Sequence, residues 1–263
     1  MSLPPIDCTV DLAHGGRWTS WRSGRREWLW RNRLVSAAER SAAAPGDAFV
    51  DAGGAEECLP TVRGRPDHGD TWSRPWSGTS ADAWVEVPGL GTLRRSVAAG
   101  PVLQVGYRID GAPGTRFLHA VHALLGLSED AVLELPEART MIILDQPGQE
   151  RRWPSGLDRL GPDDGTATCA VVPGVRRAVI TDGADRLQLD WDCPEAPELC
   201  SLMLWRNLGG WPQAAPYRSI GIEPMVGRAA DRSTAAPGDC AVIGSSGVFH
   251  WSLTIRASTN APT

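Results

Sequence analysis

Lysine is absent from the sequence, and all 26 basic residues are arginine. Against 31 acidic residues this gives a net charge of -5, so there is no excess of positive charge to attract nucleic acid. Long apolar runs are also lacking: none approaches the roughly 20 residues of a membrane span, and the N-terminus lacks a secretion-signal pattern. We therefore expect a cytoplasmic protein with no nucleic-acid partner and no membrane partner.

Metal-binding patterns are missing as well. The six cysteines are scattered without CxxC spacing, which predicts free and mostly buried thiols rather than a zinc knuckle or a redox pair. The chain has no HxH pair followed closely by a glutamate, the arrangement that a cupin-like metal site would need. We predict neither a metal nor a cofactor.

Helical periodicity is weak, whereas alternation of apolar and polar residues is frequent. Because side chains on a strand point to opposite faces in turn, alternation predicts half-buried strands, and it is clear at 102–110, 186–192 and 249–256. Residues 115–127 could form a short amphipathic helix, and 38–44 a helical turn. Many strands without intervening helices predict an all-β fold of stacked antiparallel sheets. With 263 residues and no repeat or linker, we expect a single domain over 1–263.

Tryptophan is abundant, with 12 residues against 2 tyrosines and 3 phenylalanines. An indole on a loop can stack on the C–H face of a sugar while its N–H binds a hydroxyl, and it can equally fill a β core. Both interpretations stay open for the tryptophans in loop-like contexts, which are Trp72, Trp76, Trp153 and Trp211. The core is expected for those on alternating strands, which are Trp84, Trp191 and Trp251.

Polar residues that could carry chemistry occur in short clusters. His68 lies between Asp67 and Gly69 in a loop-like segment, where it is either a binding residue or a solvated loop residue. Glu223 precedes a proline at the end of an apolar strand, so we expect it at the rim of a sheet. A carboxylate there can be catalytic or can bind loop backbone.

His119 and His122 are three residues apart in an apolar segment. On a helix they would share a face, whereas on a strand they would point to opposite sides, so that only one could face a cleft. Either one could also be a hydrogen-bonded core histidine. The spacing alone does not decide between these possibilities.

The order of these clusters resembles the aldose 1-epimerase superfamily, especially its less-characterised bacterial galactose mutarotase-like branch. The similar segments are HGGRWTSWRSGRREWLW, GGAEECLPTV, DHGDTWSRPW, FLHAVHALL followed by LELP, LGGWP and GIEPMVGRAAD. They run in the same order over about residues 8–256. The resemblance implies a β-supersandwich of large antiparallel sheets with a cleft for a small-molecule sugar.

The resemblance also implies roles for particular residues. Glu223 would take the proton of the anomeric hydroxyl, His122 would protonate the ring oxygen with His119 in reserve, and His68 would bind sugar hydroxyls. A carboxylate such as Asp67 or Glu57 could hold the pKa of the catalytic histidine near neutrality. The predicted sugar-binding residues are Arg74, Trp72, Glu57, His119 and Trp211.

Some features of the superfamily are not matched securely. The candidates for its arginine near the first histidine are Arg63 and Arg65, which precede His68, and Arg74, which follows it. Asp190 and Asp192 are the candidates for its later aspartate. Whether the sugar is phosphorylated therefore stays open, as does the choice between monomer and homodimer. Alternative functions are a non-catalytic sugar-binding module and a lyase or glycosidase, for which Glu56, Glu57 and Glu223 could supply a carboxylate pair.

Overall fold

Two large antiparallel sheets dominate the computed structural model, which describes residues 5–144 and 149–259. Within these residues the first sheet has the order β1-β2-β4-β10-β18-β17-β14-β12-β13, with β3 paired to β2. Its strands are β1 (Ile6–Asp11), β2 (Arg17–Ser23), β3 (Arg26–Glu27), β4 (Ala55–Cys58), β10 (His119–Leu125), β12 (Thr140–Ile143), β13 (Gln149–Arg152), β14 (Thr166–Pro173), β17 (Cys200–Trp211) and β18 (Tyr217–Val226).

The second sheet has the order β11-β15-β16-β20-β8-β7-β6-β5 in the same described residues. Its strands are β5 (Ser77–Gly78), β6 (Asp82–Val87), β7 (Gly91–Ala98), β8 (Leu103–Gly111), β11 (Val132–Glu134), β15 (Arg177–Asp182), β16 (Asp185–Asp192) and β20 (Val248–Thr259). The remaining elements are the pair β9 (Arg116–Phe117) and β19 (Ala241–Val242), the helix α1 (Ala37–Ala42) and the 3₁₀ turn η1 (Pro197–Leu199).

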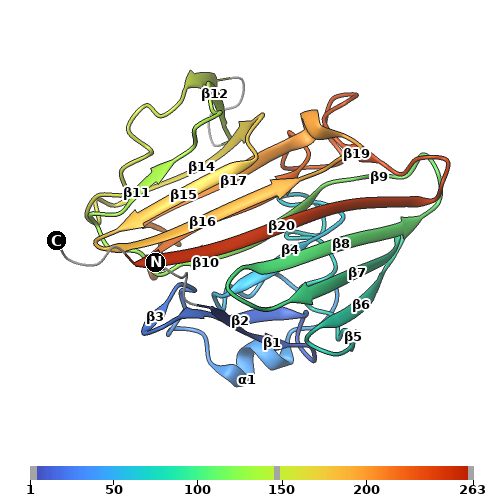
Figure 1. The fold of residues 1–263 in the computed structure, drawn as a ribbon, viewed down its shortest axis with the longest axis horizontal. Helices are drawn as coiled ribbons and strands as arrows, with labels where there is room; N and C mark the ends of the chain where they lie inside the picture. Colours follow the sequence, from blue (N-terminus) through green and yellow to red (C-terminus); the bar gives the residue numbers. More distant parts are fainter. Residues whose placement is uncertain (1–4, 145–148, 260–263) are drawn as a thin grey trace.

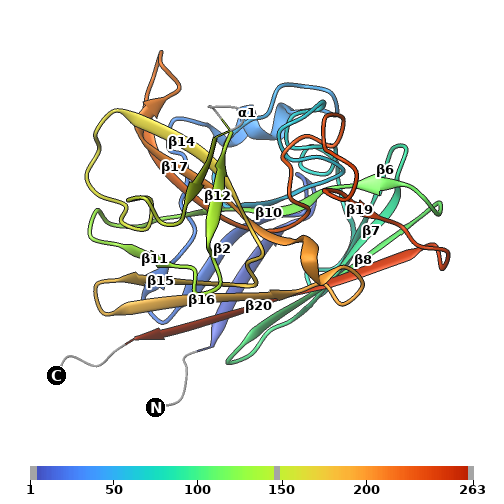
Figure 2. The same ribbon diagram turned by 90° about the horizontal axis from the view of Figure 1, so that it is seen from above.

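The sheets pack face to face, with the second sheet in front in Figure 1 and below the first in Figure 2. Apolar side chains from both inner faces fill the space between them in one continuous core. A second, smaller cluster lies on the other face of the first sheet and includes Cys58, Ala120, Met203 and Met225. The first sheet therefore has apolar contacts on both faces, and it is the second of these faces that carries the candidate site.

The strands predicted from alternation are present. Residues 102–110, 186–192 and 249–256 fall largely within β8, β16 and β20, whose burial alternates as a half-buried strand requires. The segment 115–127 forms β9 and β10 rather than a helix. In β10 all seven residues are buried, because the strand lies in the middle of its sheet with packing on both faces. The predicted helical turn at 38–44 corresponds to α1, whose first turn is capped by the Ser36 hydroxyl.

The tryptophans divide differently from the sequence prediction. Trp191 and Trp251 lie in the core as expected, but Trp84 is 37% exposed because Ala83, Val85 and Val87 occupy the inner face of β6. The prediction that Trp84 fills the core is therefore wrong. Among the loop tryptophans, Trp72 and Trp76 are buried, Trp153 packs against the core, and Trp211 is exposed.

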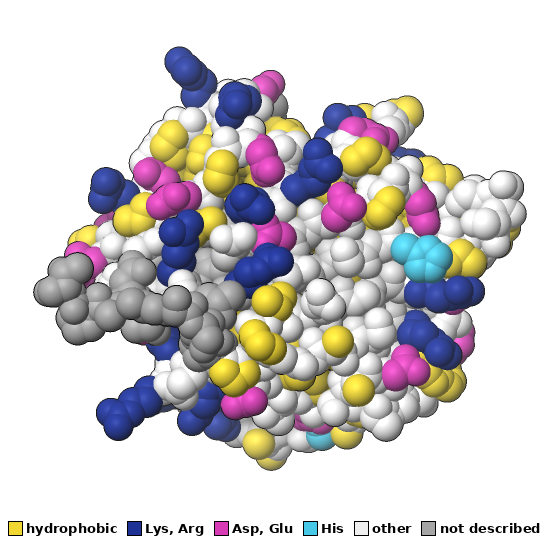
Figure 3. Space-filling view, in the orientation of Figure 1, with side chains coloured by type: hydrophobic (Ala, Val, Ile, Leu, Met, Phe, Trp, Pro, Cys, Tyr) yellow, Lys and Arg dark blue, Asp and Glu magenta, His cyan; other side chains and the backbone are white. Residues whose placement is uncertain are grey.

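The outer face of the second sheet is charged, with arginine and acidic side chains intermixed (Figure 3). Asp190 accepts hydrogen bonds from Arg177 and Arg256, and Arg108 pairs with Asp110. None of the six cysteines, all of which lie in the described residues, forms a disulfide, and five of them are buried, as predicted. No helix in the described part of the chain is long and apolar enough to cross a membrane.

One group of polar side chains crosses the apolar core and joins the two sheets. Glu57 of β4 is fully buried and accepts hydrogen bonds from Arg95 of β7 at 2.8 Å and from Tyr107 of β8 at 3.0 Å. His119 of β10 contacts the same carboxylate through Nε2 at 3.1 Å. Because the Trp251 indole can only donate, and does so to Nδ1 of His119 at 2.9 Å, the hydrogen of His119 must be on Nε2.

Each member of this inter-sheet network is held in a fixed role. Burial alone would raise the pKa of Glu57, but the hydrogen bonds from His119 and Arg95 and the positive charge of Arg95 lower it. The Arg95 guanidinium also donates to the Gly16 carbonyl at 2.7 Å and lies over the Trp18 ring. A buried charge pair with this many partners is costly to break on one side only.

We expect the substitution Glu57→Gln to lower the free energy of unfolding by about 3–5 kcal/mol, because it leaves the buried Arg95 charge without its counter-ion. Urea denaturation would measure the loss, with Glu86→Gln as the control on the exposed face of β6. A loss for Glu57→Gln within about 0.5 kcal/mol of the control, the usual range for surface changes, would contradict a structural role for the network.

Candidate active site

Three ionisable side chains lie side by side across the centre of the first sheet. The register of β4 with β10 places Glu56 directly opposite His122, and the register of β10 with β18 brings Glu223 to the other side of His122. All three point to the face away from the second sheet, since their neighbours in sequence point into the core. Glycine at position 221 makes room for this arrangement, because a Cβ there would lie 2.4 Å from Oε1 of Glu223.

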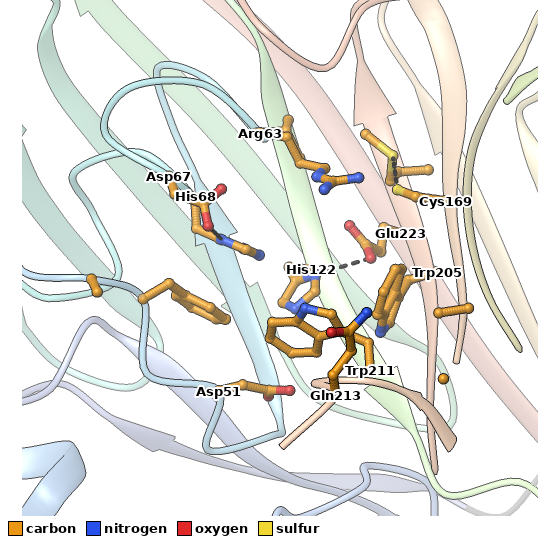
Figure 4. Close-up of a pocket in the computed structure, with 16 residues that line it drawn as sticks. Asp51, Arg63, Asp67, His68, His122, Cys169, Trp205, Trp211, Gln213 and Glu223 are labelled. Carbon is orange, nitrogen blue, oxygen red and sulfur yellow. Dashed lines mark hydrogen bonds and ion pairs between the residues drawn. The ribbon is translucent and has the colours of Figure 1, made fainter. Parts of the chain in front are cut away.

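A cleft of about 770 Å³ opens above this row, within the usual size range of small-molecule sites. Figure 4 shows His122 and Glu223 at its floor, with loop residues on one side and strand residues on the other. The residues that line it are Ala48, Phe49, Asp51, Val62, Arg63, Asp67, His68, His122, Ala167, Cys169, Met203, Trp205, Gly210, Trp211, Gln213 and Glu223.

His122 and Glu223 form an ion pair, with Nδ1 of the imidazole 2.9 Å from Oε1 of the carboxylate. Burial opposes a charge on His122, but the nearby Glu223 carboxylate and its hydrogen bond outweigh it and raise the pKa of His122 to about 9. Asp51 and Glu56 act in the same direction. At neutral pH His122 is therefore protonated and can donate a proton.

His68 stands over this pair in the opposite protonation state. Its ring stacks on Phe49 with the centroids 3.6 Å apart, and it meets the His122 ring edge to face at 4.8 Å. Burial lowers the pKa of His68, although Asp67, whose Oδ2 is 3.2 Å from Nδ1, acts against the shift. A neutral imidazole can both donate and accept hydrogen bonds, which suits the recognition of hydroxyl groups.

The loop that carries His68 is held close to the end of β4. His68 itself has a positive φ of 60°, and the following Gly69 has a φ of 73°. A Cβ at Gly69 would lie 2.2 Å from the Leu59 carbonyl oxygen, so only glycine allows the loop to approach this closely. The sequence DHG thus fixes the ring of His68 over the cleft.

Of the residues predicted from the sequence, the structure brings His68, His122, Glu223 and Trp211 together in the cleft. It also decides between the two histidines: β10 is a strand, so His122 faces the cleft and His119 faces the core. Trp211 is 47% exposed at the cleft edge and meets Trp205 edge to face.

Several other predicted residues lie elsewhere. Glu57 and His119 belong to the buried inter-sheet network, so neither can contact a ligand in the cleft, and neither can tune His122 as Glu57 was expected to do. The carboxylate that raises the pKa of the cleft histidine is Glu223. Trp72 is buried beneath the Arg40 guanidinium and against Phe49, which makes it a support for the cleft rather than part of its lining.

Of the arginine and aspartate candidates from the sequence, some line the cleft and others do not. Arg74 pairs with Asp70, 3.6 Å away, and does not line the cleft, whereas Arg63 does. Asp190 and Asp192 lie on the outer side of the second sheet in ion pairs with arginines, which excludes both from the cleft. No group of three or more metal-ligating side chains occurs among the residues that the structure describes.

Sequence reasoning missed four polar or aromatic groups of the cleft. Asp51 and Phe49 come from the loop before β4, Gln213 from the turn between β17 and β18, and Trp205 from the middle of β17. None belongs to a recognisable motif. The only signal was positional: Phe49 and Asp51 immediately precede the Gly53–Gly54 turn that leads into β4.

Glu56 lies beside the cleft but is engaged by other residues. It is 2% exposed, and Arg40 donates a hydrogen bond to its Oε1 at 3.1 Å. Burial raises the pKa of Glu56, opposed mainly by the charges of Arg40 and Arg17. With Glu56 and Glu57 both outside the cleft lining, neither can form with Glu223 the carboxylate pair that hydrolysis of a glycoside would require.

The His122–Glu223 pair at the floor of the cleft joins a proton donor to a proton acceptor. Protonated His122 uses Nδ1 to hold Glu223, and its Nε2–H is then the proton available for transfer. Glu223 retains its second carboxylate oxygen as an acceptor. Two such groups, fixed side by side at the floor of an open cleft, can deliver a proton to one oxygen of a ligand and remove a proton from its neighbour.

We expect Glu223→Gln to lower the pKa of His122 from about 9, because burial is then opposed only by the smaller contributions of Asp51 and Glu56. Proton NMR of the imidazole Cε1–H signals across a pH titration would measure the change, with His122→Asn to assign the signal and Glu86→Gln as control. An unchanged titration in Glu223→Gln would contradict the pairing.

No protein-family model matches the sequence, and no curated protein matches it. Solved structures do. The Slr1438 protein of Synechocystis sp. PCC 6803 is 16% identical with a TM-score of 0.73, covering 97% of this chain and 95% of that one. A proposed aldose 1-epimerase of Escherichia coli K12 is 14% identical with a TM-score of 0.73, covering 97% and 96%.

A galactose mutarotase related enzyme of Lactobacillus acidophilus is also similar, at 13% identity and a TM-score of 0.68, covering 100% of this chain and 97% of that one. At such low identities the similarity concerns the fold and not the chemistry. The β-supersandwich predicted from the sequence is thereby confirmed: the chain has the galactose mutarotase-like fold.

Proposed function

We propose that the protein is an aldose 1-epimerase, which interconverts the α and β anomers of a sugar by opening and closing its ring. The observation that carries this proposal is the His122–Glu223 pair, 2.9 Å apart at the floor of the cleft. Anomer exchange needs one proton removed from O1 and one delivered to O5, two oxygens bonded to the same carbon. A donor and an acceptor in direct contact match that requirement.

In the proposed reaction Glu223 accepts the proton of the anomeric hydroxyl, and the O1 electron pair forms the aldehyde carbonyl. The bond between C1 and O5 breaks, and Nε2 of His122 gives its proton to O5. Rotation about the bond between C1 and C2 then presents the other face of the aldehyde. Closure reverses both proton transfers, so each residue returns to its starting state and no cofactor is consumed.

The surrounding residues suit a sugar ligand. His68, stacked on Phe49, offers a neutral imidazole for hydroxyl groups. Trp205 and Trp211 offer flat apolar surfaces for the C–H faces of a sugar ring. The Trp205 indole N–H donates a hydrogen bond to the Ser219 hydroxyl at 3.0 Å, which fixes the orientation of the indole. The names of the structural neighbours, among them a galactose mutarotase related enzyme, support the same assignment.

Freshly dissolved α-D-galactose and α-D-glucose should reach anomeric equilibrium faster with the protein than in buffer. Because Gln cannot accept the O1 proton, Glu223→Gln should lower kcat by about 10²–10⁴-fold. NMR of the anomeric protons would follow both sugars, with Glu86→Gln expected to match wild type. Sugar binding without acceleration would instead identify a non-catalytic sugar-binding module.

The activity should depend on pH through His122. Since the pKa of His122 is raised to about 9, the acid is protonated throughout the neutral range, and on the alkaline side kcat/KM should fall as the pH rises through about 9. Initial rates corrected for hydroxide-catalysed exchange in buffer would give the profile. A decline centred near the ordinary histidine pKa of about 6.5 would show that His122 is not the acid.

A further inference from the structure

Asp51 presents a carboxylate to the cleft at a place that the proposed reaction does not use. In Figure 4 it lies on the opposite side of His122 from Arg63, near Gln213 and Trp211. It is half-buried and comes from the loop between α1 and β4. A ligand whose reacting carbon is at the His122–Glu223 pair would place another part of its ring or its substituents against Asp51.

The Asp51 carboxylate is held in one orientation. The Tyr217 hydroxyl donates to its Oδ2 at 2.6 Å, and the Gly53 backbone N–H donates to its Oδ1 at 3.1 Å. Asn32 fixes the backbone by donating to the Asp51 carbonyl at 2.8 Å. Tyr217 is itself held by stacking on Trp30, and burial together with Asp51 raises its pKa, so it remains a donor.

Among the described residues, the Asp51 carboxylate differs from that of Glu223 in having no cation in direct contact. Glu223 pairs with the protonated His122. Among the described residues the direct partners of Asp51 are neutral donors, a phenol and a peptide N–H. Two donors leave lone pairs on both oxygens, which can accept hydrogen bonds from ligand hydroxyls.

We propose that Asp51 is a binding residue that selects a neutral aldose over its phosphate ester. A fixed carboxylate accepts hydroxyl hydrogen bonds strongly, while an incoming phosphate would meet a like charge in a partly desolvated site. This inference rests on the proposed function for its view of which ligand enters the cleft. Tyr217 acts through Asp51 and is a positioning residue.

The test compares D-galactose with D-galactose 6-phosphate on wild type, Asp51→Asn and the control Asp192→Asn, which removes the same charge from the far side of the second sheet. Titration calorimetry measures binding, and NMR of the anomeric protons measures turnover. Wild type should favour the neutral sugar at least about 10-fold, and Asp51→Asn should bind it about 10-fold more weakly while accepting the phosphate better. Asp192→Asn should match wild type.

Tyr217→Phe provides a second variant that keeps the Asp51 charge. Losing the hydroxyl frees the carboxylate to move, so KM for D-galactose should rise several-fold while kcat stays within about twofold of wild type. Loss of kcat with unchanged KM would assign Tyr217 to the reaction itself and overturn its positioning role.

The outcomes separate this inference from the proposed function. Weaker neutral-sugar binding in Asp51→Asn, without any turnover by wild type, would support the role of Asp51 and contradict the epimerase. Turnover by wild type with an unchanged preference in Asp51→Asn would overturn the role of Asp51 alone. Equal or better use of the phosphate by wild type would also overturn it. Binding of neither sugar by wild type would overturn both.

Discussion

The two-residue period of β10 is the constraint on which the rest of the structure depends. His119 and His122 are three positions apart on a fully buried strand. Because side chains alternate between the two faces of a strand, the two histidines must point to opposite faces of the sheet. Each then meets a glutamate from a neighbouring strand: His119 meets Glu57 of β4 on the core face, and His122 meets Glu223 of β18 on the cleft face. The strand thus connects the packing of the two sheets to the floor of the candidate site.

The two histidine–glutamate pairs are chemically alike, and their surroundings give them different roles. Arg95 and Tyr107 donate hydrogen bonds to the Glu57 carboxylate, and Trp251 donates one to the second ring nitrogen of His119. No proton of this buried pair is therefore available to an outside molecule. Around Glu223, the imidazole Nε2 faces an open cleft, and the carboxylate charge raises the pKa of His122 to about 9. Engaging the Glu57 carboxylate and both ring nitrogens of His119 in hydrogen bonds gives a structural network, whereas leaving one donor and one acceptor toward the cleft gives a pair that can exchange protons with a ligand.

The sequence predicts the fold well because the relevant signals are local. Alternation at 186–192 and 249–256 depends only on which face of a strand is buried, and the motifs DHG and GIEP depend on short-range backbone geometry. The position of Glu57 could not be predicted in the same way. Glu56 and Glu57 are adjacent and both acidic, and only the pairing register of β4 decides which one enters the core.

Asp51 illustrates the part of the site that sequence cannot supply. Its partner Tyr217 lies 166 residues away, and the two meet only because the turn between β17 and β18 comes close to the loop before β4. Neither residue belongs to a short motif, so no local pattern marks them. The error on Trp84 has a different origin, since alternation defines two faces of a strand without saying which is buried, and Ala83 and Val85 take the inner positions of β6.

Rigidity links these contacts to the proposed chemistry. The rings of His68 and Phe49 are stacked, Asp51 is held by Tyr217 and Gly53, and Glu223 is held by His122, so the polar groups of the cleft are oriented before a ligand arrives. Groups fixed in this way lose little entropy on binding and need little reorganisation when charge moves between O1 and O5. A site that only bound sugar would gain the same entropic benefit, whereas the proposed reaction also uses the proton of His122 and the free carboxylate oxygen of Glu223. That pairing stabilises charges of both signs at neighbouring ligand atoms, which is what the opening of a sugar ring demands.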